Sequence, residues 1–216
     1  MAVNHDPATL GEGIHWPSAV YLAGWDLFAP DAAQRYAMLK ALCAEYGLVG
    51  VSPVDAVADM DKNADKAVAA GQVQTRDAAA AALISAHNEA LVDRCGSLLA
   101  NLSPFRGTEP DSGTVWEASR AHALGKLVVG YTSDMRSLAQ RVRAEHGSVA
   151  ASDPVMGVIE RDGRYGLAIE DFGLPANLMI AVPVPLYASA EAAVRQLSAL
   201  VQRADRQTCR GCRPAA

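Results

Sequence analysis

The stretch LLANLSPFRGTEPDSGTVWEASRAHAL, residues 98–124, contains the junction on which the predicted fold rests. It begins with a short apolar run, Leu98–Leu102, which has the length and composition of a strand covered on both faces. A loop rich in proline and glycine follows, and then a helical pattern over Gly113–Leu124. A buried strand that leads through a loop into a helix is part of a βαβ unit, so the stretch predicts an α/β protein.

The same alternation recurs on both sides of this junction. Three further apolar runs are typical of buried strands, at Ala19–Ala23, Leu48–Ser52 and Leu127–Tyr131. Other helical patterns lie at Asp31–Tyr46, Arg76–Arg94, Asp134–His146 and Ala190–Arg203. Together they predict a doubly wound, Rossmann-like or flavodoxin-like parallel sheet flanked by helices. We expect a single domain over residues 19–204, an N-terminal arm over 1–18 and a C-terminal tail over 205–216.

Charge and composition restrict the partners of the protein. The formal net charge of -5 argues against binding a nucleic acid polymer or an anionic membrane surface, since both are usually bound through basic patches. The sequence shows no signal peptide pattern and no apolar run of transmembrane length, which predicts a cytoplasmic protein. Cys43 and Cys95 lie in apolar contexts, and Cys209 and Cys212 form one CxxC without a second ligand pair, so we expect no metal and no cofactor.

The topology predicts where a ligand binds. Ligands of open parallel sheets bind beyond the carboxyl ends of the strands. The loops expected there are Gly24–Pro30, Pro53–Gln74 and Ser103–Gly113, of which the second is long enough to form a lid or an extra helix. The aromatic side chains of Trp25 and Phe28 could stack on a ligand or pack in the core.

Two more features lie near the C-terminal half of the chain. Residues 154–159 and 167–169 are expected to form a hairpin around Arg161–Arg164. The run FGLPANLM, residues 172–179, predicts a stiff loop that presents the amide of Asn177.

Two carboxylates follow the strand in the opening stretch. Asp111 is predicted in the loop and Glu117 on the first turn of the helix, an arrangement that could divide a nucleophile role from a proton-handling role in glycosyl transfer. The structural alternative is a capping box, in which Thr114 caps the helix and Glu117 reaches back to the cap amide. These residues alone leave both interpretations open.

The chain resembles the nucleoside 2-deoxyribosyltransferase family in three blocks that follow one another in the family's order. These are YLAGW at 21–25, ANLSPFRG at 100–107 with PDSGTVWE at 110–117, and FGLPANLM at 172–179. The second block is the most specific, and the resemblance spans residues 19 to 180.

The resemblance implies a mechanism and a set of site residues. In the family, the glutamate at the position of Glu117 attacks C1′ of the deoxyribose, releases the base, and forms an ester that a second base attacks with retention. Tyr21 would orient this carboxylate, and Asp111 would face the base or sugar and handle the leaving-group proton. Asn88 stands where relatives place an acid, and because an amide cannot donate a proton as an acid, we expect an altered base preference. The remaining expected substrate-binding residues are Gly24, Trp25, Phe28, Asn177 and Met179.

The resemblance also implies partners. Deoxyribonucleosides and free nucleobases would be the substrates, and the enzyme would be a homo-oligomer in which Asn177 completes the active site of a neighbouring subunit. The alternative for Asn177 is that it only satisfies its own turn.

Other functions and roles stay open at this stage. Water could resolve the ester, as in 2′-deoxynucleoside 5′-phosphate N-hydrolases, or the protein could be a non-catalytic nucleoside sensor. Tyr21 could be a core residue, and His87 and His122 are more typical of core or surface histidines than of acid–base groups. Arg106 could attract a phosphate or pair with Glu109 or Asp111.

Overall fold

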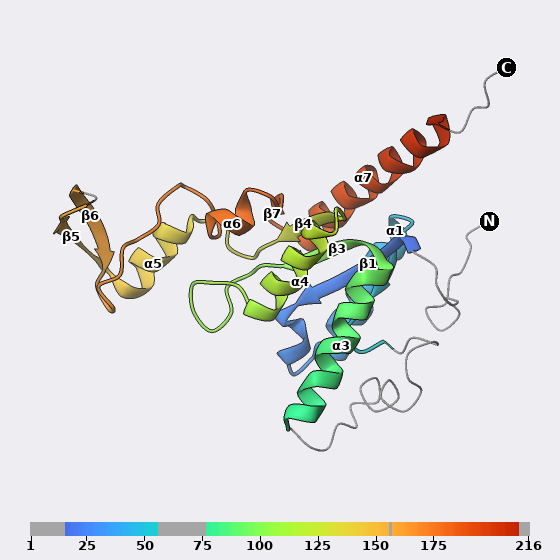
Figure 1. Cartoon of the computed structure of the whole chain (residues 1–216), viewed down its shortest axis with the longest axis horizontal. Helices are drawn as coiled ribbons and strands as arrows, with labels where there is room; N and C mark the ends of the chain where they lie inside the picture. The colour runs from blue at the N-terminus through green and yellow to red at the C-terminus, as the bar shows by residue number, and fades with distance from the viewer. Residues whose placement is uncertain (1–15, 56–76, 156, 212–216) are drawn as a thin grey trace.

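The computed structural model describes residues 16–55, 77–155 and 157–211, and its centre is a five-stranded sheet covered by helices (Figure 1). The strand order is β2-β1-β3-β4-β7, and every neighbouring pair is parallel. The predicted doubly wound α/β fold is therefore confirmed. In chain order the strands of this sheet are β1 (Trp16–Gly24), β2 (Val49–Val51), β3 (Cys95–Asn101), β4 (Leu127–Tyr131) and β7 (Leu186–Tyr187).

Helices follow or precede these strands as the alternation predicts. Their bounds are η2 (Trp25–Phe28, a 3-10 turn), α1 (Ala32–Glu45), α3 (Ala78–Arg94), α4 (Ser112–Ala123), α5 (Leu138–His146), α6 (Leu178–Ala181) and α7 (Ala190–Gly211). The expected lid over residues 53–74 falls mostly outside the described residues, as does Cys212 of the CxxC pair.

The central strand β3 shows why the sheet is covered on both faces. Leu98 packs with α3 and α4 on one face, whereas Leu99 packs with α1 and α7 on the other. Both side chains are at most 1% exposed. Successive strand residues point to opposite faces, so an unbroken apolar run requires a layer of helices on each side.

The strand order is that of flavodoxin-like sheets, in which the chain turns back between β1 and β3. The two strands pair in register up to Gly24 opposite Asn101, so both end at the same edge of the sheet. Loops that leave β1 and β3 there diverge to helices on opposite faces. This edge is the topological switch point at which such folds bind ligands.

Side-chain caps set where the helices begin. The carboxylate of Asp77 accepts a hydrogen bond from the amide of Ala80 at the start of α3, and Asp111 accepts one from the amide of Thr114 at the start of α4. A complete capping box is present at α5, between Ser137 and Gln140. The capping box considered for Thr114 and Glu117 is wrong, because Asp111 is the cap and Glu117 lies on the second turn of α4.

An arm built from α5 and a hairpin extends away from the sheet (Figure 1). The hairpin pairs β5 (Ser148–Asp153) with β6 (Gly157–Asp162), so its turn comes earlier than residues 161–164, where the sequence pattern placed it. The reversal over 163–166 is present, and after it the chain pairs with β6 through one bridge, between Arg161 and Ala168, and through backbone hydrogen bonds from Asp162 to Leu167 and from Ile169 to Glu160. The small residues of β5 gave no alternating apolar signal, which is why that strand escaped prediction.

Two short elements near the C-terminus were also not predicted. β7 has two residues and α6 has four, too few for either periodicity to emerge. In the part of the chain that the structure describes, no helix combines the length and apolarity that a membrane crossing requires.

The two-sided burial of β3 generates a stability prediction. Leu99→Ala should lower the free energy of unfolding by about 2–5 kcal/mol, because it leaves a cavity between β3 and the helices α1 and α7. Urea unfolding followed by circular dichroism measures this change. The matched control is Leu124→Ala, whose side chain is 53% exposed and which should change stability by less than about 0.5 kcal/mol. Equal effects of the two variants would contradict the placement of β3.

Candidate active site

A buried tyrosine on β1 contacts a glutamate on α4 at the switch-point edge. The hydroxyl of Tyr21 donates a hydrogen bond of 2.7 Å to Oε1 of Glu117. Tyr21 itself is fully buried, as the core alternative required, yet its hydroxyl meets the candidate nucleophile rather than an arbitrary neighbour. Strand β1 supplies a rigid support, so the carboxylate direction is fixed from the sheet.

A second donor reaches the same carboxylate oxygen from α3. Nδ2 of Asn88 lies 3.4 Å from Oε1 of Glu117 as a long hydrogen bond. Among the described residues, Oε2 of Glu117 receives no hydrogen bond. The described residues thus hold one oxygen of the carboxylate with two donors and place no donor on the other.

An ion-pair cluster keeps α3 and α4 side by side near this site. The guanidinium of Arg120 on α4 bonds both oxygens of Asp93 on α3 at 2.9 and 2.7 Å, and it lies 3.5 Å from Glu89. A cavity of about 170 Å³ opens between the two helices, with Asn88 and Glu117 among its lining residues. Whole-ligand pockets are typically about 300–1,000 Å³, so this space is smaller than one that encloses a whole ligand.

Asp111 stands close to Glu117 in the role of a helix cap. Its Oδ2 accepts hydrogen bonds from the amide and the hydroxyl of Thr114, at 2.9 and 3.1 Å. These bonds hold the carboxylate at the N-terminus of α4, where the helix dipole favours a negative charge. Asp111 is therefore fixed in place without being buried in the core.

The surroundings of Glu117 favour its protonated form. Burial raises the pKa of Glu117 to about 7, and the negative charge of Asp111 acts in the same direction. The hydrogen bonds from Tyr21 and Asn88 oppose this shift, because they stabilise the ionised carboxylate. Burial and the nearby Glu117 raise the pKa of Tyr21 well above its ordinary value, so Tyr21 remains a donor at neutral pH.

The ends of β1 and β3 are joined by a buried polar network that the sequence did not reveal. Asp26 is 4% exposed and accepts hydrogen bonds from Asn101 at 2.7 Å and from Arg35 at 3.2 Å. A Cβ on Gly24 would lie 2.6 Å from the Asp26 carboxylate and 2.8 Å from Asn101, so only glycine fits there. The one available signal was the position of Asn101 at the end of a buried strand.

The aromatic residues expected near the base form a stack with a third ring. Phe105, from the loop after β3, stacks on Trp25 at 6.1 Å and on Phe28 at 5.4 Å between ring centroids. The guanidinium of Arg106 lies over Phe105 and Phe28, in place of an ion pair with Glu109 or Asp111. The stack assembles beside the switch-point edge, and Phe28 remains 58% exposed.

The structure does not bring Asn177 and Met179 to the other site residues of the same chain. Asn177 caps α6 by accepting a hydrogen bond from the amide of Met179 at 3.0 Å, and its amide group donates to Glu170 at 2.9 Å. Met179 is 75% exposed. In the described residues, no hydrogen bond links this segment to Glu117 or Tyr21.

The α6 segment instead forms one wall of an apolar groove against α4. The groove has a volume of about 420 Å³, and its other wall is the face of α4 that carries Val115, Ala118 and His122. Glu117 is not among its lining residues. His87 on α3 is buried, with 2% of its surface exposed, as expected of a core histidine.

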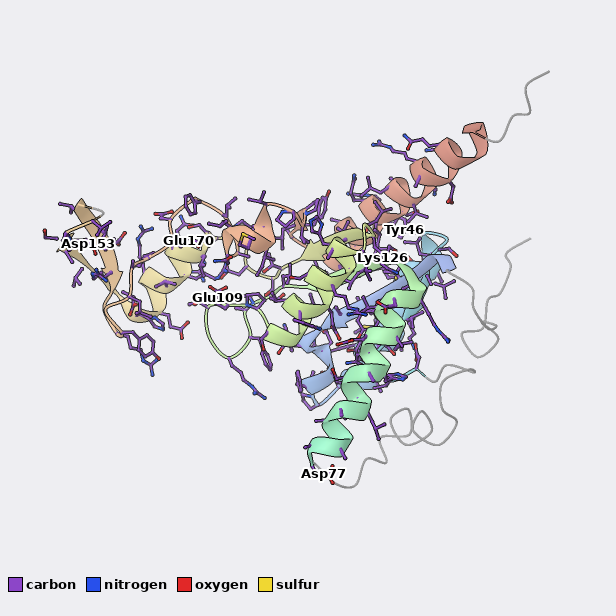
Figure 2. The ribbon with its side chains drawn as sticks, in the orientation of Figure 1. Tyr46, Asp77, Glu109, Lys126, Asp153 and Glu170 are labelled. Atoms are coloured by element: carbon purple, nitrogen blue, oxygen red, sulfur yellow. The ribbon has the colours of Figure 1, made fainter. Side chains whose placement is uncertain are left out.

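The stick view in Figure 2 shows where six labelled residues lie along the molecule. Lys126 lies beside the sheet, and Asp153 lies on the hairpin. Glu109 and Glu170 lie around the segment that joins the central sheet and its covering helices, here called the body, to the arm formed by α5 and the hairpin. The site around Glu117 belongs to the body, between α3 and α4.

Comparisons with known proteins place the chain in a family. The chain matches the family described as nucleoside 2-deoxyribosyltransferase over residues 20–179. A solved structure of a 2-desoxiribosyltransferase from Leishmania mexicana is similar, with a TM-score of 0.59 and 27% sequence identity, over 85% of this chain and 98% of that one. An uncharacterized protein from Schizosaccharomyces pombe is 31% identical over 131 residues, or 60% of this chain, and the match spans 57% of that relative's length.

The family match covers well over half of the chain and includes β1, β3 and α4, which hold Tyr21, Asp111 and Glu117. The chain belongs to the nucleoside 2-deoxyribosyltransferase family.

Proposed function

We propose that this protein transfers 2-deoxyribose between nucleobases through a covalent ester on Glu117. The observation that carries the proposal is the asymmetric support of this carboxylate. Tyr21 and Asn88 both donate to Oε1, whereas Oε2 receives no hydrogen bond from the described residues. A carboxylate held in this way presents one oxygen as a nucleophile while the other is fixed in direction.

In the first step, Oε2 of Glu117 attacks C1′ of the bound nucleoside from the face opposite the base. The C1′–N bond breaks and its electron pair leaves with the base, while a new C1′–O bond forms. In the second step an acceptor base attacks C1′, and the glutamate leaves as a carboxylate. Each step inverts C1′, so the product nucleoside keeps the starting configuration.

The departing base needs a proton or a hydrogen bond on its nitrogen. Asn88 lies against the nucleophile, but its amide can only donate a hydrogen bond and cannot supply a proton as an acid. Asp111 is the carboxylate best placed for this role, because Thr114 holds it beside the site and its negative charge raises the pKa of Glu117. We assign proton handling to Asp111 and a share of base preference to Asn88.

Transfer is favoured over hydrolysis of 5′-phosphates by the cap of α4. A phosphate cradle would use the free amides at the start of this helix. The amide and hydroxyl of Thr114 are instead bonded to the Asp111 carboxylate, and a second anion beside that carboxylate would be repelled.

We also propose that the active sites are shared between subunits. Asn177 and Met179 lie on the exposed segment that borders the apolar groove of about 420 Å³ between α4 and α6. Burying this groove against a second copy of the chain would remove exposed apolar surface from water and would place a partner's segment near α4. A neighbouring wall would also shield the glycosyl ester from water.

Replacing the nucleophile gives the first test. Glu117→Gln should lower base exchange between deoxyadenosine and free cytosine or hypoxanthine by about four to six orders of magnitude, the range seen on removing single members of a catalytic triad. Chromatography of the products separates the three functions: a new nucleoside indicates transfer, free sugar indicates hydrolysis, and no product from the wild type indicates a sensor. Glu45→Gln, on the exposed side of α1, is the matched control and should keep full activity.

The pH dependence of stability tests whether Glu117→Gln is correctly folded. The pKa of Glu117 is about 7 in the folded protein, above the unfolded value of about 4.3, so the native state binds more protons between these values. Wild-type stability should fall relative to Glu117→Gln as the pH rises from 4.3 to 7, and the difference should be constant above that. If Glu117→Gln were inactive and also less stable than the wild type, misfolding would explain its loss of activity.

Removing the Tyr21 hydroxyl should change the pH profile. The nucleophile must be ionised, so kcat/KM of the wild type should rise with pH through an apparent pKa of about 7. Tyr21→Phe deletes a hydrogen bond that lowers the pKa of Glu117, so the acid limb should move to higher pH. An unmoved limb in initial-rate measurements from pH 5 to 9 would refute the orienting role of Tyr21.

Mixing two inactive variants tests the shared site. Glu117→Ala and Asn177→Ala should each be inactive alone, and subunit exchange between them should regenerate some intact sites. The recovered activity, measured after exchange is verified by mass spectrometry of the mixed oligomer, should be a fraction of that of the wild type. No recovery after verified exchange, or a fully active monomer by light scattering, would contradict shared sites.

A further inference from the structure

Arg141 on α5 is a buried cation, and all its hydrogen bonds to other described residues go to backbone carbonyls. It is 4% exposed. Nε donates to the carbonyl of Thr108 at 3.1 Å, Nη2 to that of Pro175 at 2.7 Å, and Nη1 to those of Arg136 at 2.7 Å and Asp134 at 3.3 Å. One planar side chain thus joins three separate segments of the chain.

Each of these segments leads to a different part of the molecule. Thr108 lies in the loop between β3 and α4, three residues before Asp111. Asp134 and Arg136 form the turn after β4. Pro175 precedes Asn177 by two residues at the entry to α6.

The loop after β3 depends on this contact for its direction. Its turn is closed by the amide of Phe105, which donates to the carbonyl of Glu109 at 2.8 Å. Arg141 holds the carbonyl of Thr108 within that turn, between Phe105 in the aromatic stack and Asp111 at the cap of α4. Glu109 and Glu170 are close enough for their charges to interact, which agrees with their adjacent positions in Figure 2.

Stability alone does not account for an arginine at this position. Burying a cation costs free energy, and an apolar side chain of similar volume commonly gives equal or greater stability. The planar guanidinium gives something that an apolar chain cannot, namely several donors in fixed directions. Four hydrogen bonds in fixed directions set the positions of three chain segments relative to one another.

We propose that Arg141 is a positioning residue that fixes the Asp111 loop and the Asn177 segment relative to each other. This inference rests on the proposed function, because it assigns the two segments to the reaction. The rigid placement sets the orientation of groups in the transition state, so its loss acts on kcat more than on KM.

The variant Arg141→Met keeps the length and apolar stem of the side chain but removes the donors. It should lower kcat for base exchange by about 100-fold, the cost of a misplacement of about 1 Å, while KM changes far less. Arg141→Lys should recover part of this loss. Arg143→Met is the matched control on the same helix, since Arg143 pairs with Glu160 and Asp171 on the surface, and it should keep wild-type kcat.

Chemical rescue separates positioning from stability. A cavity of about 250 Å³ borders Arg141, Thr108 and Asp134, which gives a small cation access to the position vacated in Arg141→Ala. Millimolar guanidinium should raise kcat of Arg141→Ala several-fold and leave that of Arg143→Ala unchanged. Wild-type kcat in Arg141→Met, or a loss that follows only the melting temperature and is not rescued, would overturn the proposal.

Hydrogen exchange gives a readout that does not need turnover. In Arg141→Met, the amides of Phe105 and of Leu138, which donates to Leu174 at 2.8 Å, should lose protection, while amides of β1 should not. If the wild type shows no base exchange but these amides lose protection, the proposed function fails and the positioning role stands. Unchanged protection would overturn the positioning role.

Discussion

The parallel pairing of β1 with β3 is the constraint on which the site depends. It sets Gly24 opposite Asn101, so the strands end together, and the chain leaves them toward opposite faces of the sheet. The buried carboxylate of Asp26 then bridges the two strand ends through Asn101 and extends to α1 through Arg35. Because a Cβ on Gly24 would clash with both Asp26 and Asn101, the glycine is a requirement of this close approach.

The chemistry proposed for Glu117 depends on where that pairing places two elements. Tyr21 lies on the face of β1 that α4 covers, so its hydroxyl meets Oε1 of Glu117 inside the protein rather than in water. Burial raises the pKa of the glutamate, and the hydrogen bonds from Tyr21 and Asn88 limit the rise. A carboxylate balanced in this way is less solvated, and hence more nucleophilic, than a surface glutamate while still ionising near neutral pH.

The body and the arm of the molecule have different tasks in this arrangement. The body carries the buried sheet, the α3–α4 cavity and the proposed nucleophile, Glu117. The arm and α6 carry Asn177 and exposed apolar side chains beside the groove. Arg141 joins the two parts, since it bonds the loop that leads to Asp111 and the segment that leads to Asn177.

The sequence alone determined the architecture, because the signals for it are local. A run such as Leu98–Leu102 is typical of a strand covered on both faces, and its repetition between helical patterns indicates a doubly wound sheet. The family blocks around Glu117 and Tyr21 likewise stand in the chain itself. The short or weakly patterned elements β5, α6 and β7 were not predicted, because a segment of two to six residues is too short or too uniform to show a clear periodicity.

Only the tertiary structure decided which polar side chains meet. Glu117 fitted a capping box by spacing, yet Asp111 caps the helix and Glu117 turns toward Tyr21, because the helix begins earlier than Thr114. The Asp26 network and the carbonyl bonds of Arg141 join segments far apart in the chain. Such contacts have no local pattern, because their partners are brought together only when the strands pair and the helices pack.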